Sequence, residues 1–408
     1  MPIIRKLSSF VARLPVPARV SVVIFFLAAV ADGALMPFFA LWALKIAHVE
    51  VAWIGVLFGC YAGGELFATP LIGGIADRIG RRRVLLLSTA GVGVGFILLL
   101  FAQGPWTAAA CLILIGVFES VLHPTAATVI ADVSAPDKLT QSMALLRLAS
   151  NAGGMVGPAL GAAFAVVSLR FVFVGAGLAL LIGTLCVAIF LAETRPANTH
   201  GEEGEEESLT ALTAVFRDRK LAALLIPVAI LGVASSWIES VTPLYANANG
   251  VLSETGIGLL FTYAGALGVA LQMPLTAASS RYSASAVIVA AAIVQVAAFA
   301  FLLAPVSVAG LVGAVTAFSL SRMLLGPLSN AIALAMAPAH ARATYQAAFG
   351  ITNDLRDTAG PALGIWLFAF GANLPWAIGA PVSAAAGLVL ALELRAKGTP
   401  AAAKKEPG

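Results

Sequence analysis

Long apolar runs alternate with short polar breaks along the chain, and this pattern predicts helices that cross a membrane. Two runs, residues 84–118 and 282–321, contain no charged residue, and each is long enough for two spans of roughly 20 residues. Each run breaks near its middle at a turn signal, Gln103-Gly104-Pro105 in the first and Ala304-Pro305 in the second. The apolar runs are continuous and lack the alternation of a membrane barrel, so we expect helices.

Extending this reading to the whole chain predicts twelve helical spans and an all-α membrane protein. The expected spans are 20–44, 51–76, 84–102, 106–132, 139–166, 170–192, 221–247, 253–278, 285–303, 308–337, 340–369 and 374–394. The expected domains are an amphipathic cytoplasmic segment at 1–19, a six-helix bundle at 20–192, an acidic cytoplasmic linker at 193–219, a second six-helix bundle at 220–395 and a cytoplasmic tail at 396–408.

Composition agrees with a membrane protein. Hydrophobic residues make up 60% of the chain and charged residues 11%, with a mean hydropathy of +0.97, whereas soluble domains have about 25% charged residues. If both termini are cytoplasmic, 19 Lys and Arg residues lie in inner segments and 2 lie in outer loops, Lys45 and Arg170. This asymmetry predicts both cytoplasmic termini in a cytoplasmic (inner) membrane, and the net charge of +4 then needs no nucleic-acid partner.

The two halves of the chain are an internal repeat. The sequence GPALG occurs at residues 157–161 and 360–364, and a shift of 203 residues also places Ile54-Gly55 on Ile257-Gly258 and Pro124 on Pro327. Each half holds six predicted spans, so both halves begin on the same side of the membrane. Parallel repeats of this kind occur in transporters that bind substrate in a central cavity between the halves.

Two motifs carry a resemblance to a known family. The loop after the second span reads Gly73-Gly-Ile-Ala-Asp77-Arg78-Ile-Gly80-Arg81-Arg82, and the fifth span contains Gly153-Gly-Met-Val-Gly157-Pro158-Ala-Leu-Gly161. The first resembles the GxxxDRxGRR signature of the major facilitator superfamily, and the second resembles the GxxxGPxxGG signature of its drug/proton antiporters. Ala162 departs from the second signature at its last glycine.

The resemblance implies roles for both motifs. Asp77 and Arg82, with Asp132 as an acidic partner, are similar to a latch that holds the two halves together on the cytoplasmic side. The glycines at 153, 157 and 161, with Pro158, form a small-residue stripe that can pack tightly and bend, and Gly360, Pro361 and Gly364 repeat it. Anchoring of the membrane topology by the arginines and ordinary small-residue packing are the alternatives. Many of these antiporters carry an arginine in the outer part of the fourth span, and residues 111–116 contain none; either Arg147 replaces it or the coupling differs.

Charged residues inside the predicted spans point to the transport pathway. Each costs about 2.5 to 3.5 kcal/mol at the bilayer centre, so these side chains are expected to face protein or water, in the cavity between the halves. The embedded charges are Asp32, Glu65, Glu119, Arg147, Glu239, Arg322, Asp354, Arg356 and Asp357.

Proton coupling needs a buried carboxylate that binds either a proton or substrate. Asp32 and Glu119 are the first candidates, followed by the pair Asp354 and Asp357 and then Glu239. A structural ion pair with Arg147, Arg322 or Arg356 is the alternative for each of them. The candidates for lining the cavity or binding substrate are Arg147, Asn151, Arg322, His123, Trp237 and Tyr263.

The sequence therefore predicts a proton-coupled exporter of lipophilic drugs or a small metabolite that works by alternating access as a monomer in the lipid bilayer. An importing symporter or a uniporter on the same fold is the alternative. An enzyme or a receptor is a more remote alternative. The four histidines lack the spacing of metal ligands, and the sequence contains no nucleophile motif and no ATP-binding motif. We expect neither a cofactor nor a metal; a proton gradient would supply the energy.

Overall fold

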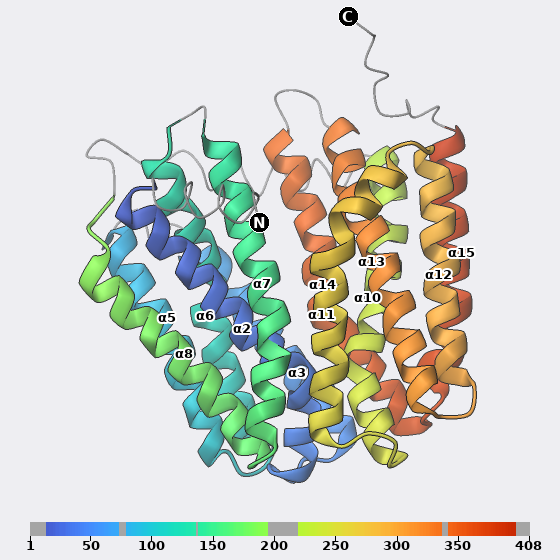
Figure 1. Cartoon of the computed structure of the whole chain (residues 1–408), viewed down its shortest axis with the longest axis horizontal. Coiled ribbons are helices and arrows are strands. Elements are labelled where there is room, and N and C mark those ends of the chain that lie inside the picture. Colours follow the sequence, from blue (N-terminus) through green and yellow to red (C-terminus); the bar gives the residue numbers. More distant parts are fainter. Residues whose placement is uncertain (1–13, 73–78, 136–137, 195–218, 337–341, 397–408) are drawn as a thin grey trace, which may run out of the picture. The chain divides into compact units, whose positions relative to one another are not determined.

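Every regular secondary-structure element in the described residues is a helix (Figure 1). The computed structural model describes residues 14–72, 79–135, 138–194, 219–336 and 342–396. The helices are α2 (Val16–Lys45), α3 (Val51–Ile72), α5 (Arg81–Leu98) continued by the 3-10 turn η1 (Leu99–Phe101), α6 (Pro105–Val133), α7 (Leu139–Ala165), α8 (Leu169–Phe190), α10 (Arg219–Ala248), α11 (Glu254–Ser279), α12 (Ala284–Leu303), α13 (Val308–Met336), α14 (Arg342–Phe370) and α15 (Leu374–Ala396). These twelve α-helices confirm the predicted all-α fold.

Local sequence explains where these helices begin. Pro105 starts α6 directly after Gly104, whose φ of +87° suits a residue without a side chain. Ser168, Ser253 and Ser283 precede α8, α11 and α12, and each side chain accepts a hydrogen bond from a backbone N–H of the first turn. The turn signals at Gly104-Pro105 and Ala304-Pro305 therefore mark true helix boundaries.

Ten of the twelve described helices are long and apolar enough to cross a membrane. The two that fall short are α7 and α14. Both carry polar side chains in mid-helix, Arg147 and Asn151 on α7 and Arg356 and Asp357 on α14. They are also related by the 203-residue repeat, and each contains one copy of GPALG.

Contacts divide the described residues into two compact units, with residues 14–48 and 60–194 in the first and residues 49–59 and 219–396 in the second. The first turns of α3 thus cluster with the second unit, although the sequence predicted all of 20–192 as one bundle. The predicted linker lies almost wholly outside the described residues, and so do the amphipathic segment before residue 14 and the tail after residue 396.

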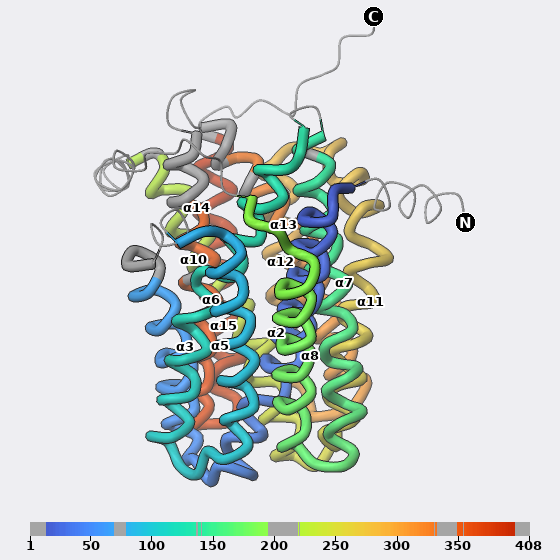
Figure 2. Tube along the Cα trace, turned by 90° about the vertical axis from the view of Figure 1, so that its left-hand side faces the viewer, coloured from blue at the N-terminus to red at the C-terminus, as the bar shows by residue number. Residues whose placement is uncertain are grey.

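The same helix neighbours recur in each unit and confirm the repeat. In the first unit α2 packs beside α7 and α8, as Figure 2 shows, and α5 packs on α6 and α8. In the second unit α10 packs on α14 and α15, and α12 packs on α13 and α15. Each of these pairs maps onto its counterpart when the chain is shifted by half its length.

An aromatic cluster in each core repeats this correspondence at the level of side chains. Phe173 lies 5.4 Å from Trp42 and 6.4 Å from Phe96, measured between ring centroids. At the positions 203 residues later, Trp376 lies 5.5 Å from Tyr245 and 6.4 Å from Phe299. The first contact of each set is edge to face, a geometry that aromatic quadrupoles favour. The two halves therefore share their core packing as well as their topology.

Candidate functional site

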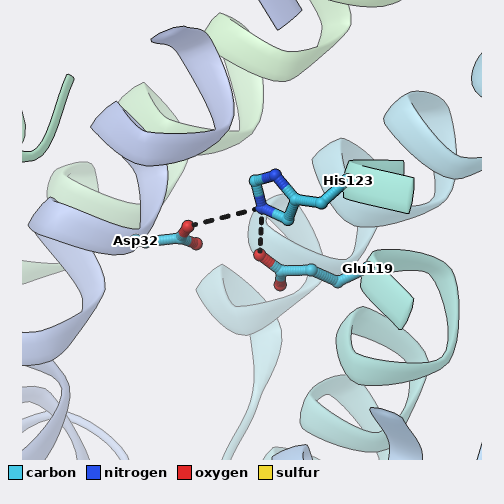
Figure 3. Close-up of side chains that lie close together, drawn as sticks. All are labelled: Asp32, Glu119 and His123. Atoms are coloured by element: carbon cyan, nitrogen blue, oxygen red, sulfur yellow. Dashed lines mark ion pairs between the residues drawn. The ribbon is translucent and has the colours of Figure 1, made fainter. Parts of the chain in front are cut away.

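Three ionisable side chains meet in the first unit, inside predicted spans (Figure 3). The His123 Nε2 atom lies 4.0 Å from Asp32 Oδ2 and 3.9 Å from Glu119 Oε1. Glu119 is buried, with 4% of its side chain exposed, whereas the side chains of Asp32 and His123 are 36% and 32% exposed. One carboxylate thus lies deep in the bundle, and the other two groups lie at its edge.

Close contacts between helix backbones bring a fourth group to this cluster. A Cβ atom on Gly116 of α6 would strike the Tyr61 carbonyl oxygen of α3, and one on Gly64 of α3 would lie 2.6 Å from the Ile113 carbonyl oxygen of α6. The two glycines let α3 and α6 touch along their backbones. As a result, the Tyr61 hydroxyl reaches across and donates a 2.8 Å hydrogen bond to Glu119 Oε2.

Neighbouring residues on α2 fix the other side of the cluster. Gly33 follows Asp32 and faces α7, where a Cβ atom on Gly33 would lie 3.1 Å from the Gly154 carbonyl oxygen. The Phe25 ring meets the His123 ring edge to face, with 5.1 Å between centroids. His123 also lies one helical turn after Glu119 on the same face of α6. The imidazole is therefore held between α2 and its own helix.

Two carboxylates with an imidazole between them can exchange a proton within a few ångströms. The Tyr61 hydroxyl donates to one oxygen of the buried Glu119 carboxylate, and the imidazole of His123 lies beside the other. One oxygen or nitrogen of each of the three groups lies within 4.8 Å of the others. Because a divalent cation also fits such a spacing, the expectation of no metal stays a prediction.

The second unit holds a separate set of charges. Arg322 of α13 contacts Glu239 of α10 with 3.4 Å between Nη1 and Oε2, and Arg356 of α14 forms a two-pronged pair with Asp357 at 2.7 and 2.9 Å. Both contacts are the ion pairs that the sequence left open as alternatives to a transport role. The side chain of Asp354 lies outside the described part of the structure.

Four other predicted residues lie on α7, α10 and α11. Arg147 and Asn151 are exposed on α7. Trp237 is buried against α14, where its ring occupies the space that a Cβ atom on Gly364 would need. The Tyr263 hydroxyl shares a 3.0 Å hydrogen bond with Thr316. Tyr61 was missed by sequence reasoning; its one signal is that it is the first tyrosine of five and stands alone in the first half of the chain.

A family model described as Major Facilitator Superfamily matches residues 22–356. The chain belongs to this superfamily. Its members build their fold from two six-helix repeats, which agrees with the recurring helix neighbours and aromatic clusters. This chain is accordingly a multi-pass membrane transporter of that superfamily.

Within the superfamily, the chain is similar to several curated resistance proteins. It is 26% identical over 383 residues to a class D tetracycline resistance protein of Salmonella ordonez, covering 92% of the chain and 96% of the relative. It is 31% identical over 204 residues to a class E tetracycline resistance protein of Escherichia coli, and 27% identical over 229 residues to the multidrug resistance protein MdtG of Escherichia fergusonii. The last two matches span about half of each chain, 48% and 49% for the class E protein and 54% and 54% for MdtG.

Several solved transporter structures share the fold. The nucleoside transporter NupG superposes with a TM-score of 0.79 at 12% identity, covering 94% of this chain and 99% of NupG. A POT family transporter in complex with 5-aminolevulinic acid gives 0.78 at 13% identity, covering 96% and 100%. At such low identity the likeness concerns the fold alone.

The structure describes the end of the superfamily signature, where α5 begins. The start of this helix contacts Glu193, three residues after the end of α8. Gly80 precedes α5 with a φ of +98°, and a Cβ atom there would strike the Glu193 carboxylate. That carboxylate accepts hydrogen bonds from the backbone N–H groups of Arg81, at 2.9 Å, and Arg82, at 3.4 Å. Gly80 is therefore required both for its backbone conformation and for the space that Glu193 occupies.

Asp132 pairs with a different arginine from the one the resemblance suggested. Arg81 Nε lies 3.3 Å from Asp132 Oδ2, with both side chains largely buried, whereas Arg82 donates from Nη2 to the Ala188 carbonyl oxygen at 2.7 Å. Gly73, Asp77 and Arg78 lie outside the described residues. The role of the signature as a latch stays a prediction.

Replacing Glu193 tests its part in the signature. We expect Glu193→Ala to lower the stability of the protein by about 0.5 to 2 kcal/mol, because it removes the acceptor for two N–H groups at the start of α5. Thermal unfolding of the detergent-solubilised protein measures this loss, with the exposed Glu50→Ala as the matched control. Equal melting temperatures for the two variants would mean that the bonds to Glu193 contribute nothing.

Proposed function

We propose that this transporter exports lipophilic drugs or a small metabolite in exchange for protons, by alternating access, from the cytoplasm across the inner membrane. The cluster of Asp32, Glu119, His123 and Tyr61 is the observation that carries the proposal. Intramembrane ionisable groups are expensive and mark ion pathways. This cluster combines a buried acid with a second acid and an imidazole within 4.8 Å, which is the chemistry that a proton carrier needs.

The names of the relatives favour export. The match to the class D tetracycline resistance protein extends over 96% of that protein, and MdtG is named for multidrug resistance. In this proposal Asp32, the more exposed acid, exchanges protons with the aqueous side, and Glu119 holds the proton inside the bundle with His123 between them. Substrate and proton would then compete for the charged state of the cluster.

Proton flux in energised inverted vesicles tests the proposal. We expect a panel of lipophilic compounds, tetracycline among them, to release protons from vesicles that contain the wild-type protein, because each compound enters the vesicle in exchange for a proton. Asp32→Asn keeps the size of the side chain and removes its charge, so it should abolish this release while the protein reaches the membrane at wild-type level.

The direction of flux separates export from its alternatives. An importing symporter would take up substrate together with protons in intact cells and would not release protons from inverted vesicles. A uniporter would equilibrate substrate in proteoliposomes regardless of the pH gradient. Either result, or unchanged proton release by Asp32→Asn, would contradict proton-coupled export through this cluster.

A further inference from the structure

A small cavity lies in the second unit, among α10, α12, α13 and α14. Its polar lining includes Arg322, Arg356, Ser235, Ser329 and Asn353, and the rest is largely apolar. The volume is about 70 Å³, well below the roughly 300 to 1,000 Å³ of a pocket that encloses a drug-sized ligand. The cavity has room for a few water molecules or for one charged group of a larger molecule.

The cavity lining is positively charged. Arg322 and Arg356 both contribute to it, whereas no described acidic side chain does. Glu239 and Asp357 contact the two guanidinium groups but are not part of the lining. The cavity thus offers hydrogen-bond donors to an incoming group, and the acids that pair with its two arginines lie outside the lining.

The two arginines differ in how firmly they are held. Arg356 is fixed by its two-pronged pair with Asp357 at 2.7 and 2.9 Å, the short range of charge-assisted hydrogen bonds. Arg322 has one polar contact among the described residues, to Glu239 at 3.4 Å, and half of its side chain is exposed. A guanidinium carries five N–H donors, and among the described side chains Glu239 accepts from one of those on Arg322. The Phe318 ring, 5.5 Å from its Cζ atom, supports the guanidinium without using a donor.

We propose that this cavity binds the carboxylate of a transported substrate, which exchanges with Glu239 for the guanidinium of Arg322. The planar fork of an arginine matches a carboxylate, and the fixed charge of Arg356 on the opposing helix adds attraction. The small volume admits the carboxylate while the rest of the molecule stays outside. This inference names a substrate class, organic acids with an apolar body, and rests on the proposed export function only in treating the bound acid as cargo.

Binding to the purified full-length protein tests this site without transport. The probe is benzoate, with benzamide as the uncharged molecule of the same shape, and isothermal titration calorimetry in detergent measures the affinity. We expect benzoate to bind and benzamide to bind far more weakly. Arg322→Gln should weaken benzoate binding at least about tenfold, the loss expected when a hydrogen bond to a charged group is removed.

Glu239→Gln gives the sharpest expectation, because it should strengthen benzoate binding by removing the competing carboxylate. A merely structural ion pair would make Arg322→Gln and Glu239→Gln change the affinity in the same direction. If Arg322→Gln is poorly folded, the double variant R322Q/E239Q, which leaves no unpaired acid, is compared with E239Q instead. Arg170→Gln, an arginine in the first unit at the start of α8, is the matched control and should bind as wild type does.

Three results would overturn the proposal: no benzoate binding by the wild type, equal affinity for benzamide, or wild-type affinity in Arg322→Gln. None of these results would contradict the proposed export function, which the vesicle assay tests independently. Conversely, benzoate binding with the expected pattern in the variants, in a protein that moves no protons, would leave the acid site standing and remove proton-coupled export.

Discussion

Glu119→Gln is expected to abolish proton-driven transport, lowering its rate on the order of 100-fold or more, the lower range of effects for removing a proton-transfer group. The amide occupies nearly the same volume and can still accept the 2.8 Å hydrogen bond from Tyr61, so the bundle should keep its packing. It cannot bind and release a proton. Substrate-induced proton release from inverted vesicles measures the effect, with the exposed Glu50→Gln as the matched control.

Tyr61→Phe separates proton transfer from positioning at the same site. This variant removes only the hydroxyl that contacts Glu119 Oε2 and leaves every carboxylate in place. We expect the rate of substrate-induced proton release to fall several-fold. The Glu119 carboxylate would lose its fixed orientation, and this buried acceptor would lose a hydrogen bond worth about 1 kcal/mol. Full activity in Glu119→Gln would remove this carboxylate from the coupling pathway, whatever Tyr61→Phe does.

The helices could be predicted from the sequence because their signals are local. The span expected at 106–132 is α6, Pro105–Val133, and it begins at the proline that the turn signal marked. The pairing of Glu119 with His123 was likewise accessible, since residues four apart share a helix face. A continuous apolar run, a proline or an i,i+4 spacing carries its meaning within a few residues.

The rest of the site depends on contacts between distant helices. The hydrogen bond from Tyr61 to Glu119 joins residues 58 positions apart and exists because Gly64 and Gly116 let two backbones touch. No pattern in the sequence gives that register. The same limit explains the signature arginines. Consecutive residues on a helix point about 100° apart, so only coordinates show that Arg81, and not Arg82, reaches Asp132.

The two copies of GPALG acquire a common physical meaning in the structure. A Cβ atom on Gly157 of α7 would strike the Val30 carbonyl oxygen of α2, and one on Gly360 of α14 would strike the Ser236 hydroxyl of α10. These are the same helix pairs in the two halves, and Val233, the repeat equivalent of Val30, lies 3.3 Å from the Gly360 position. The motif is thus the place where the first helix of each half packs directly on the fifth. Bending at the prolines stays a prediction.

Gly157→Val and Gly360→Val are therefore expected to destabilise the protein strongly, each at the upper end of the 1 to 3 kcal/mol that overpacking costs, or about 3 kcal/mol. The loss should be larger for Gly157, because its nearest neighbours are backbone atoms, which cannot rotate away as the Ser236 side chain can. Thermal unfolding of the solubilised protein measures both variants.

Gly154→Val and Gly326→Val are the matched controls, since both glycines are helical and a Cβ atom on either meets nothing within 4 Å. Valine is a slightly better helix former than glycine, so the controls should melt at or above the wild-type temperature. If Gly157→Val and Gly154→Val unfold at the same temperature, the close contact between α2 and α7 contributes nothing to stability. The packing explanation of the duplicated motif would then fail.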